Sequence, residues 1–515
     1  MAIDTRREWN KVRIETTIVF IVYLLGMIAI GLWMYRKNET TSDYFLGGRS
    51  LNSWVTAMSA QASDMSGWLL LGLPGLVYLT GLNGMWMGVG LAVGTYLNWQ
   101  FVAKRLRRYT EVNNSITIPD YLENRFKDRT KALRVISALT ILVFFLFYTA
   151  SGLVASGVLF QETFGINYQI ALLVGALVVV SYTFLGGFLA VSLTDFFQGM
   201  LMFIVLLIVP IALFSMLGGV GGALSAVSKV NPDLLDITKA VSLDDSGSWI
   251  SQAGAFSVIG TISLVAWGLG YFGQPHIIVR FMGIRSARDI PIARLIGVVW
   301  VTLTLLGAGF IGLLGITQFN TPLANEETVF ITLAQTLFNP WVAGLVVAAI
   351  FSAIMSTIDS QLLVCSSAIA EDFYRPFLRK NASERELVWV SRATVLGVAI
   401  VAVILALSGG SVLELVSYAW AGFGAAFGPV ILLSLFWKRM TKTGALIGVI
   451  VGGLTVILWS NIPLFSGTGL YELVPGFVLG LLAIIVISLL GKEPPSEVTA
   501  EFDQATRPLP GEIAS

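Results

Sequence analysis

Residues 59–75 read SAQASDMSGWLLLGLPG, and residues 267–275 read WGLGYFGQP. Each stretch places polar residues together with Gly and Pro inside an apolar run. A single glycine in such a run more often only permits close packing of helices. Two matched stretches indicate more, because transporters bind their substrates near the middle of the membrane, where paired helices are interrupted. The two stretches therefore predict a pair of broken helices that face one binding site.

Apolar runs of about 20 residues, the length that crosses a bilayer, continue along the chain on both sides of these stretches. The chain has 515 residues, of which 56% are hydrophobic and only 12% are charged, whereas soluble domains carry about 25% charged residues. We predict an all-α polytopic membrane protein with about 13 transmembrane helices, because helices satisfy their own backbone in lipid. Their expected limits are 14–35, 53–79, 84–102, 135–160, 169–187, 192–217, 251–274, 292–315, 341–367, 388–408, 412–436, 444–463 and 473–491.

The two broken segments are the second and the seventh of these helices, five positions apart. This spacing predicts two five-helix repeats, at about 53–217 and 251–436, which are inverted because each repeat holds an odd number of helices. The transporter domain then covers 14–491. The tail at 492–515 is polar and contains proline, so we expect it to be disordered.

The distribution of Lys and Arg predicts the orientation of the chain, because cytoplasmic loops are enriched in both. Nine of the 32 lie in the segment 103–134, which should be cytoplasmic. Three spans separate it from the tail at 1–13, which is then extracytoplasmic although it is itself basic. The C-terminus is then expected in the cytoplasm, with the domain in the cell membrane.

Composition and motifs exclude several classes of function. A net charge of +1 gives no reason to expect nucleic-acid binding. The lone Cys365 excludes an internal disulfide. The sequence contains no phosphate-binding loop, nucleophile–base set or metal-ligand cluster, so we expect neither an enzyme nor a redox cofactor.

Asp64 lies within the first of the two stretches. A carboxylate near the middle of the membrane costs about 2.5–3.5 kcal/mol on insertion scales, so it usually marks a function. It could attract or coordinate a cation, or carry a proton. The alternative is a side chain that caps the broken helix or bonds a neighbouring hydroxyl.

Ala353, Ser356 and Thr357 are spaced i, i+3 and i+4, so two hydroxyls and a carbonyl share one helix face. Sodium is a hard cation that takes oxygen ligands. Carbonyls freed at a helix break, such as those of Ala62 and Met65, would complete a site. Spacing alone does not exclude ordinary packing, because Ser and Thr often bond their own helix backbone.

Several other residues carry weaker signals. The aromatic residues of the second, fourth and seventh spans could enclose a small apolar ring, or they could pack the core; they are Trp68, Tyr148, Trp267 and Tyr271. Asp195 and Asp359 could lie on an ion path, although charges in contact with water at an interface are the more frequent case. His276, the only histidine, is expected at an interface.

At these residues the chain resembles the sodium/solute symporter family, over roughly residues 14–490. The stretches near Asp64 and Trp267 are similar to the branch that carries proline. The stretches that carry the resemblance are DYFLGGRSL (43–51), SDMSGWLL (63–70), WGLGYFGQPH (267–276), MST (355–357) with QLLVCSS (361–367), SYAWAGFG (417–424) and the segment 438–448.

The resemblance implies a leucine-transporter-like core and uptake of L-proline driven by Na⁺ as the coupling ion. It implies that sodium binds at Ala62, Met65, Ala353, Ser356 and Thr357, and that Asp64 raises the affinity for sodium. It further implies that proline contacts Trp68, Tyr148, Trp267, Tyr271, Gln274 and Pro275. The chain departs from the pattern at Asp359, where a small polar residue is expected, and in its longer, more basic N-terminal tail.

Other hypotheses stay open at this level. A proton-coupled carrier could use Asp64, and the solute could be another small amino acid or a betaine. A passive channel would not need two broken helices around one midplane site. A membrane receptor is disfavoured because no signalling domain follows residue 491. Affinities, stoichiometry and oligomeric state are not predicted.

Overall fold

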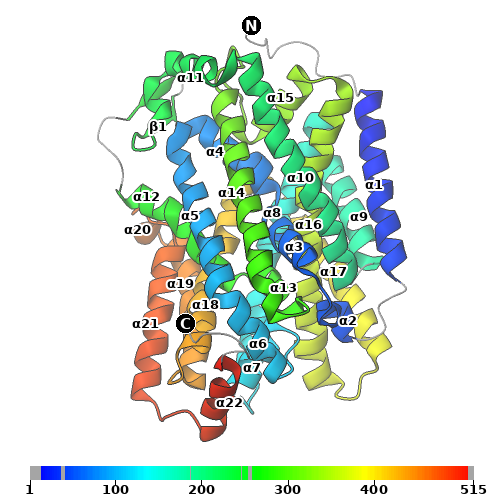
Figure 1. The fold of residues 1–515 in the computed structure, drawn as a ribbon, viewed down its shortest axis with the longest axis vertical. Helices are drawn as coiled ribbons and strands as arrows, with labels where there is room; N and C mark the ends of the chain where they lie inside the picture. The colour runs from blue at the N-terminus through cyan, green and yellow to red at the C-terminus, as the bar shows by residue number, and fades with distance from the viewer. Residues whose placement is uncertain (1–12, 36–40, 186, 245, 253–257, 508–515) are drawn as a thin grey trace.

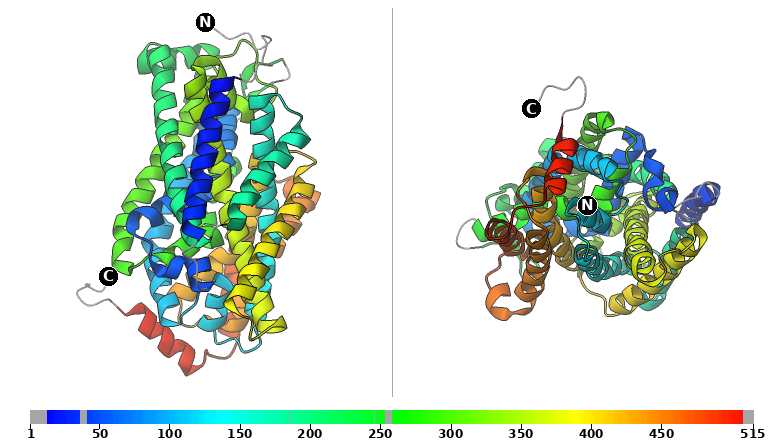
Figure 2. Two further views of the ribbon diagram at one scale, coloured as in Figure 1. Left: turned by 90° about the vertical axis from the view of Figure 1, so that its right-hand side faces the viewer. Right: turned by 90° about the horizontal axis from the view of Figure 1, so that it is seen from below.

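The computed structural model describes residues 13–35, 41–185, 187–244, 246–252 and 258–507. Long helices run side by side along the long axis of the molecule (Figures 1 and 2). The helix α11 (Gly219–Val230) lies at one end of this bundle and α22 (Ser496–Thr506) at the other. Near α11, the strands β1 (Val241–Leu243) and β2 (Trp249–Ser251) pair antiparallel, with Ser242 opposite Ile250.

Each expected apolar segment contains a continuous or a broken helix. The continuous helices are α1 (Ile14–Tyr35), α8 (Ala132–Phe164), α9 (Tyr168–Leu185), α10 (Phe188–Met216), α14 (Ile290–Gly315), α16 (Pro340–Ser367), α17 (Glu384–Ala406), α18 (Val412–Phe436), α19 (Lys442–Asn461) and α21 (Leu473–Leu490). The interrupted ones are α3 (Ser53–Asp64), η2 (Trp68–Gly72) and α4 (Leu73–Thr80); α5 (Met85–Leu97), η4 (Asn98–Ala103) and α6 (Lys104–Val112); and α12 (Val258–Val265), η6 (Ala266–Gly273) and α13 (Pro275–Gly283).

The expected number of 13 spans is not confirmed. Among the described residues, 10 helices are long and apolar enough to cross a membrane, or 11 when the bent pair of α12–η6 and α13 is counted as one. Two features lower the number. The helical segments between Trp68 and Val112 count as one span, although Gly81 separates α4 from α5 with a φ of 63°, and the apolar part of α9 covers only Tyr168–Ser181. The all-α membrane fold is confirmed, while the number 13 is not.

Short elements connect the long ones. They are α2 (Thr41–Leu46), η1 (Gly47–Arg49), η3 (Gly81–Gly84), α7 (Ile118–Arg125), η5 (Pro232–Leu235), η7 (Ala287–Asp289), η8 (Glu326–Thr328), α15 (Val329–Leu337), η9 (Ala368–Leu378) and α20 (Pro463–Ser466). Local sequence explains where several helices begin. At the start of α16, the side chain of Asn339 accepts hydrogen bonds from the N–H groups of Trp341 and Val342. Pro340 takes the first helical position, where no N–H is needed.

The central helices of the bundle are α16 and α18. In each, 83% of an apolar stretch of 18 residues is buried inside the molecule, whereas only 22% of the corresponding stretch of α1 is buried. Figure 1 accordingly places α1 at the periphery of the bundle. α16 packs against α8, α10, α1 and α3, and α18 packs against α8, α19, α21 and η6. The polar residues of α16 therefore face protein and not lipid.

Part of the C-terminal tail is ordered, contrary to the disorder expected from composition. Val498, Phe502 and Ala505 recur on one face of α22 and are buried. The ring of Phe502 lies 6.4 Å from that of Tyr109 on α6, and an ion pair joins Asp503 to Lys438 at 2.6 Å. An amphipathic face of only three apolar residues was hidden by the polar average of the segment. Residues 508–515, and 1–12 of the N-terminal tail, lie outside the described residues.

Candidate functional site

The first predicted break begins at the end of α3. Met65 leaves helical geometry, with φ −78° and ψ 75°, and the N–H of Ser66 turns back to the carbonyl of Asp64 at 2.9 Å. A side chain at Gly67 would clash with α8, because a Cβ there would lie 2.7 Å from the Cβ of Ala155. The break thus combines freed carbonyl groups with a close approach between helices.

The second predicted break separates η6 from α13. Gln274 is extended, with φ −79° and ψ 107°, and the two halves of the span are bent by 44°. Pro275 opens α13 because its ring suits a first helical turn and has no N–H to satisfy. At Gly273, a Cβ would lie only 2.3 Å from the carbonyl oxygen of Phe423, so α18 passes directly behind the break.

The two breaks meet inside the molecule. The hydroxyl of Tyr271 on η6 donates to Oδ2 of Asp64 at 2.5 Å, and both residues are buried. The hydroxyl of Tyr148 on α8 donates to the carbonyl of Asp64 at 3.3 Å. The rings of Trp68 and Trp267, one from each broken segment, have centroids 6.2 Å apart. Residues from α8 and from both broken segments therefore gather around Asp64.

The residues proposed to bind sodium largely converge on one carbonyl oxygen. Ser356 Oγ lies 2.7 Å from the carbonyl oxygen of Ala62, and Thr357 Oγ1 lies 3.5 Å from the same atom. Ser356 Oγ is also 3.2 Å from the carbonyl oxygen of Ala353. Met65 lies at the break three residues after Ala62, and among the described residues no hydrogen bond joins it to α16. All five residues are buried, and their oxygens are the ligands that a hard cation prefers.

An aromatic cluster covers the meeting point of the breaks. Trp267 stacks on Trp420 of α18, with centroids 6.3 Å apart, and on Tyr471, with centroids 5.5 Å apart. The edge of Tyr271 meets Trp420 at 5.1 Å, and the indole N–H of Trp420 donates to the carbonyl of Trp267 at 2.8 Å. Sequence reasoning did not single out Trp420 or Tyr471. Only the packing of α18 and α21 against η6 brings them here.

Gln274, Pro275 and His276 are all fully buried at the start of α13. The amide Nε2 of Gln274 donates to the carbonyls of Gly270 and Trp420. The prediction that His276 lies at an interface is wrong, because its exposed fraction is 0%. The prediction failed because four arginines make the segment 275–294 resemble a basic loop, whereas Pro275–Gly283 forms a helix inside the bundle.

Asp195 and Asp359 are also fully buried, so the interpretation that they contact water at an interface is wrong. Asp195 contacts Arg280 of α13, a residue that sequence reasoning did not single out, and Asp359 lies beside a serine that Arg280 also contacts. Arg280 Nη2 lies 3.4 Å from Asp195 Oδ2 and donates to Ser360 Oγ at 2.5 Å. The hydroxyl of Ser360 lies 3.4 Å from Asp359 Oδ1. The buried guanidinium thus pairs with Asp195 directly and is linked to Asp359 only through the hydroxyl of Ser360.

Serine hydroxyls of α3 complete this cluster. Ser59 Oγ donates to Asp195 Oδ2 at 2.7 Å and accepts from Arg280 Nε at 3.1 Å. Ser63 Oγ lies 3.2 Å from Asp195 Oδ2 and 3.0 Å from Ser360 Oγ. Ser63 adjoins both Ala62 and Asp64 in sequence. The charged cluster is therefore continuous with the oxygen-rich site described above.

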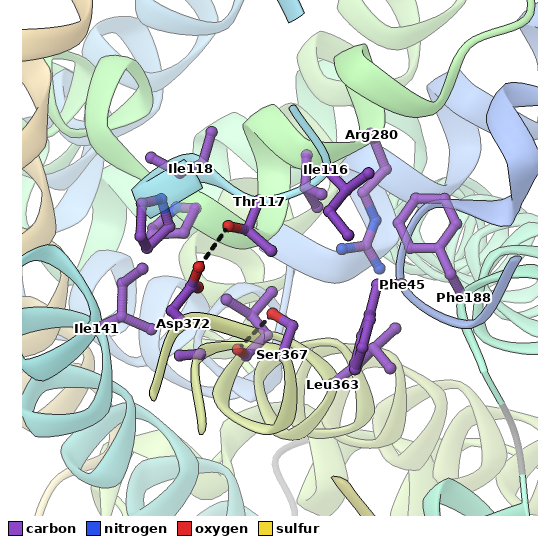
Figure 3. Close-up of a pocket in the computed structure, with 15 residues that line it drawn as sticks. Phe45, Ile116, Thr117, Ile118, Ile141, Phe188, Arg280, Leu363, Ser367 and Asp372 are labelled. Atoms are coloured by element: carbon purple, nitrogen blue, oxygen red, sulfur yellow. Dashed lines mark hydrogen bonds between the residues drawn. The ribbon is translucent and has the colours of Figure 1, made fainter. Parts of the chain in front are cut away.

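Two cavities of very different size border the candidate site, one at Trp267 and the other at Arg280. A cavity of about 640 Å³ borders Trp267 and Tyr471 and is lined by residues of α12, α18 and the segment from α19 to α21. The pocket in Figure 3 holds about 20 Å³, room for about one water molecule. Arg280 and Phe188 form one side of it and Asp372 lies across from them, held by a 3.0 Å hydrogen bond from Thr117.

Comparison with known proteins places this geometry in a family. The family described as the sodium:solute symporter family matches residues 44–452. The sodium/proline symporter of Escherichia coli (strain K12) is 50% identical over 497 residues, which cover 95% of each chain. The high-affinity proline transporter PutP of Bacillus subtilis (strain 168) is 52% identical over 482 residues, covering 93% of this chain and 98% of the other.

A solved structure shares the fold. It is the substrate-bound, outward-open state of a Na⁺-coupled sialic acid symporter, with a TM-score of 0.78 over 94% of this chain and 99% of that one. The two sequences are only 19% identical. This likeness therefore supports the helix arrangement and does not by itself assign a solute.

Proposed function

The chain belongs to the sodium:solute symporter family, and on that premise we propose that it imports L-proline together with Na⁺ by alternating access. The observation that carries the proposal is the 50% identity, over 95% of both chains, to a sodium/proline symporter. Two broken helices that meet at one buried place supply the geometry that such a carrier needs. Its location is the bacterial plasma membrane.

The proposed sodium site uses neutral oxygens. The carbonyls of Ala62, Met65 and Ala353 and the hydroxyls of Ser356 and Thr357 would bind the ion, which replaces the hydrogen bonds that Ser356 and Thr357 now direct at Ala62. Oxygen atoms already about 3 Å apart need little rearrangement to share one cation. Asp64 lies two residues from Ala62, and its carboxylate attracts the ion without having to contact it.

The proposed proline site lies beside the ion site. The rings of Trp68, Tyr148, Trp267 and Tyr271 suit an apolar pyrrolidine ring and its ammonium group. Gln274 and Pro275 mark the start of α13, where the positive end of the helix dipole favours the substrate carboxylate. Burial of all six residues supports a site that is sealed from water on at least one side.

Sodium between α3 and α16 would couple the ion to the solute. It joins a broken helix that bears substrate residues to an unbroken central helix, and so favours the conformation that binds proline. The driving force is sufficient. One charge that crosses about 150 mV gains about 3.5 kcal/mol, and a tenfold sodium gradient adds about 1.4 kcal/mol.

Several structural assignments belong to this proposal. The two inverted repeats cover about 53–217 and 251–436, the end that carries α11 faces outside, and α22 lies in the cytoplasm. The cluster of Asp195 and Asp359 lies on the route by which sodium leaves. Its continuity with Ser63 and the ion site supports this route.

Uptake of radiolabelled proline into proteoliposomes tests the proposal. At fixed pH, an inward sodium gradient should drive accumulation above equilibrium. Accumulation driven by a proton gradient without sodium would instead favour a proton-coupled carrier that uses Asp64. Proteoliposomes of folded protein that equilibrate but never accumulate proline would reject coupling altogether, and absence of any uptake would redirect the search to other amino acids and betaines.

A further inference from the structure

His276 is a buried polar side chain whose ring nitrogens are unpaired within the described part of the chain. It is the only histidine of the sequence, its exposed fraction is 0%, and neither Nδ1 nor Nε2 makes a hydrogen bond to a described residue. A neutral imidazole carries one donor and one acceptor, and buried polar groups are nearly always paired. In a dry environment such a group is destabilising unless something binds it. The ring therefore points to a ligand that the protein itself does not provide.

The surroundings of the imidazole place it next to the proposed proline site. The ring of Tyr148 meets it edge-on, with centroids 5.7 Å apart, and that of Phe145 does so at 5.4 Å. Tyr148 also bonds the carbonyl of Asp64, so the imidazole and the first helix break share a neighbour. Arg280 Nη1 donates to the carbonyl of His276 at 2.5 Å and holds the backbone here in place.

Gln274 has a complementary unpaired atom two residues earlier. Its Nε2 faces the carbonyls of Gly270 and Trp420. Carbonyls only accept, so this orientation of the amide is required and Oε1 must point elsewhere. Oε1 is buried and bonds none of the residues that the structure describes. The start of α13 thus offers an acceptor from Gln274, a donor from His276 and the positive end of a nine-residue helix.

We propose that His276 is a substrate-binding residue whose imidazole N–H donates to the carboxylate of proline, while Gln274 Oε1 accepts from its secondary ammonium. The two groups are opposite in hydrogen-bonding character, as the two ends of a zwitterion are. This inference rests on the proposed function and adds to it. It divides recognition of the solute between two residues on either side of Pro275.

A comparison of two ligands separates this role from a structural one. L-Proline carries the carboxylate, whereas L-prolinamide keeps the ring and the ammonium but replaces the carboxylate by a neutral amide. Hydrogen bonds to a charged acceptor are roughly twice as strong as neutral ones. A change in packing would weaken the binding of both ligands by the same factor. Loss of the contact with the carboxylate would weaken the binding of proline more than that of prolinamide.

The measurement is the ligand-induced rise in melting temperature of the full chain in detergent with Na⁺, titrated with each ligand. We expect His276→Phe to raise the dissociation constant of L-proline by about tenfold or more and that of L-prolinamide by less than about threefold. His276→Gln, which keeps a donor, should restore most of the affinity for proline. Gln274→Leu should weaken both ligands by a similar factor, because both carry the ammonium.

Ser137→Ala is the matched control. Ser137 lies on α8 as Tyr148 does, and its hydroxyl is buried without a hydrogen bond to a described residue, so its loss should change neither titration. Equal losses for both ligands in His276→Phe, or no loss for proline, would overturn the assignment. If His276→Phe does not fold, His276→Gln decides alone, because a loss that is equal for the two ligands rejects the proposal. A wild-type protein that binds no proline in sodium would instead reject the proposed function.

Discussion

At the scale of single residues, the proposed ion site depends on the carbonyl oxygen of Ala62. Two hydroxyls of α16 reach it, at 2.7 and 3.5 Å. We predict that Ser356→Ala, and to a lesser degree Thr357→Ala, raises the sodium concentration for half-maximal proline uptake by roughly tenfold, because each removes an oxygen ligand worth about 1–3 kcal/mol. Initial rates of uptake against sodium concentration measure the effect.

Ser352→Ala is the control for this prediction. Ser352 lies one turn earlier on the same helix, is equally buried, and donates to Ala348 at 2.7 Å and not to Ala62. Its removal should leave the sodium dependence within about twofold of the original. A shift as large as that of Ser356→Ala would mean that any hydroxyl lost from α16 has the same effect, and the assigned ligands would be wrong.

Arg280 has a structural consequence that does not depend on transport. Removing the guanidinium would take away the positive charge that pairs with Asp195, and breaking a buried pair costs about 3–5 kcal/mol. We predict that Arg280→Met lowers the melting temperature in detergent markedly. Combination with Asp195→Asn should recover part of the loss, because one uncompensated charge is then gone. A melting temperature unchanged by Arg280→Met would contradict this account.

The role of a residue can be predicted from the sequence when its immediate sequence neighbours indicate it, and not when distant helices determine its surroundings. Asp64 could be predicted because a carboxylate in an apolar run, next to Ser66 and Gly67, is costly in a membrane and usually marks a function. Arg280 and His276 could not, because their burial comes from α3 and α8, which lie more than 100 residues away in the chain. The local sequence of α13, PHIIVRFMG, gives no sign of these contacts.

At the scale of elements, the start of α8 depends on Asp128 in the loop before it. Asp128 accepts hydrogen bonds from Thr130 and from the N–H of Leu133 at 2.9 Å, and pairs with Lys442 at 3.2 Å. Burial raises the pKa of this carboxyl, but the hydrogen bonds and Lys442 outweigh burial and bring the pKa below its ordinary value. The charged form is therefore favoured by folding.

This direction determines a pH dependence. An acid whose pKa is lowered in the folded state contributes stability above its unfolded pKa of about 3.9 and loses it as pH falls through the folded pKa. We predict that Asp128→Asn destabilises the protein by about 0.5–2 kcal/mol at pH 7. The difference in melting temperature from the original should shrink below about pH 4. A gap that is the same at neutral and at strongly acidic pH would show that the charge of Asp128 is irrelevant.

Elements differ in how clearly the sequence indicates them. The two breaks were predictable because Gly and Pro cluster with polar residues, and the structure has them at Met65–Gly67 and at Gln274. The helix α22 was missed because its apolar positions are sparse. The spacing of Val498, Phe502 and Ala505, read as i, i+4 and i+7, is the signal that would have found it. The number of 13 spans stays unconfirmed in part because the apolar part of α9 is short.

At the scale of the whole molecule, coupling between sodium and proline must be reciprocal if both bind one conformation better. The proposed ion site uses residues of α3, and Trp68 of the proposed proline site follows α3 across the break, so both ligands would contact the same broken helix. We predict that saturating sodium lowers the dissociation constant of proline by about 5–150-fold, and that saturating proline lowers that of sodium by the same factor. Calorimetric titrations in both orders measure the two factors, and unequal factors would exclude a single coupled equilibrium.

The unequal cavities bear on which state the structure represents. The cavity of about 640 Å³ reaches Trp267 on the side where α18 begins, while the pocket beside Arg280 and Asp372 has room for about one water molecule. If the α11 end faces outside, the molecule is accessible from outside as far as Trp267 and closed toward the cytoplasm. The hydrogen bond from Thr117 to Asp372 is then part of the inner closure.

The stack of Trp267 with Trp420 and Tyr471 gives the protein an intrinsic spectroscopic probe of its conformation. Three rings from η6, α18 and the start of α21 lie at interplanar angles of 20–25°, and Trp68 adds a fourth at 6.2 Å. Indoles this close exchange excitation energy, and their emission and near-ultraviolet dichroism depend on spacing. Any motion that separates η6 from α18 would therefore change the wavelength and the anisotropy of the intrinsic tryptophan emission. The change could be followed in real time and without an attached dye.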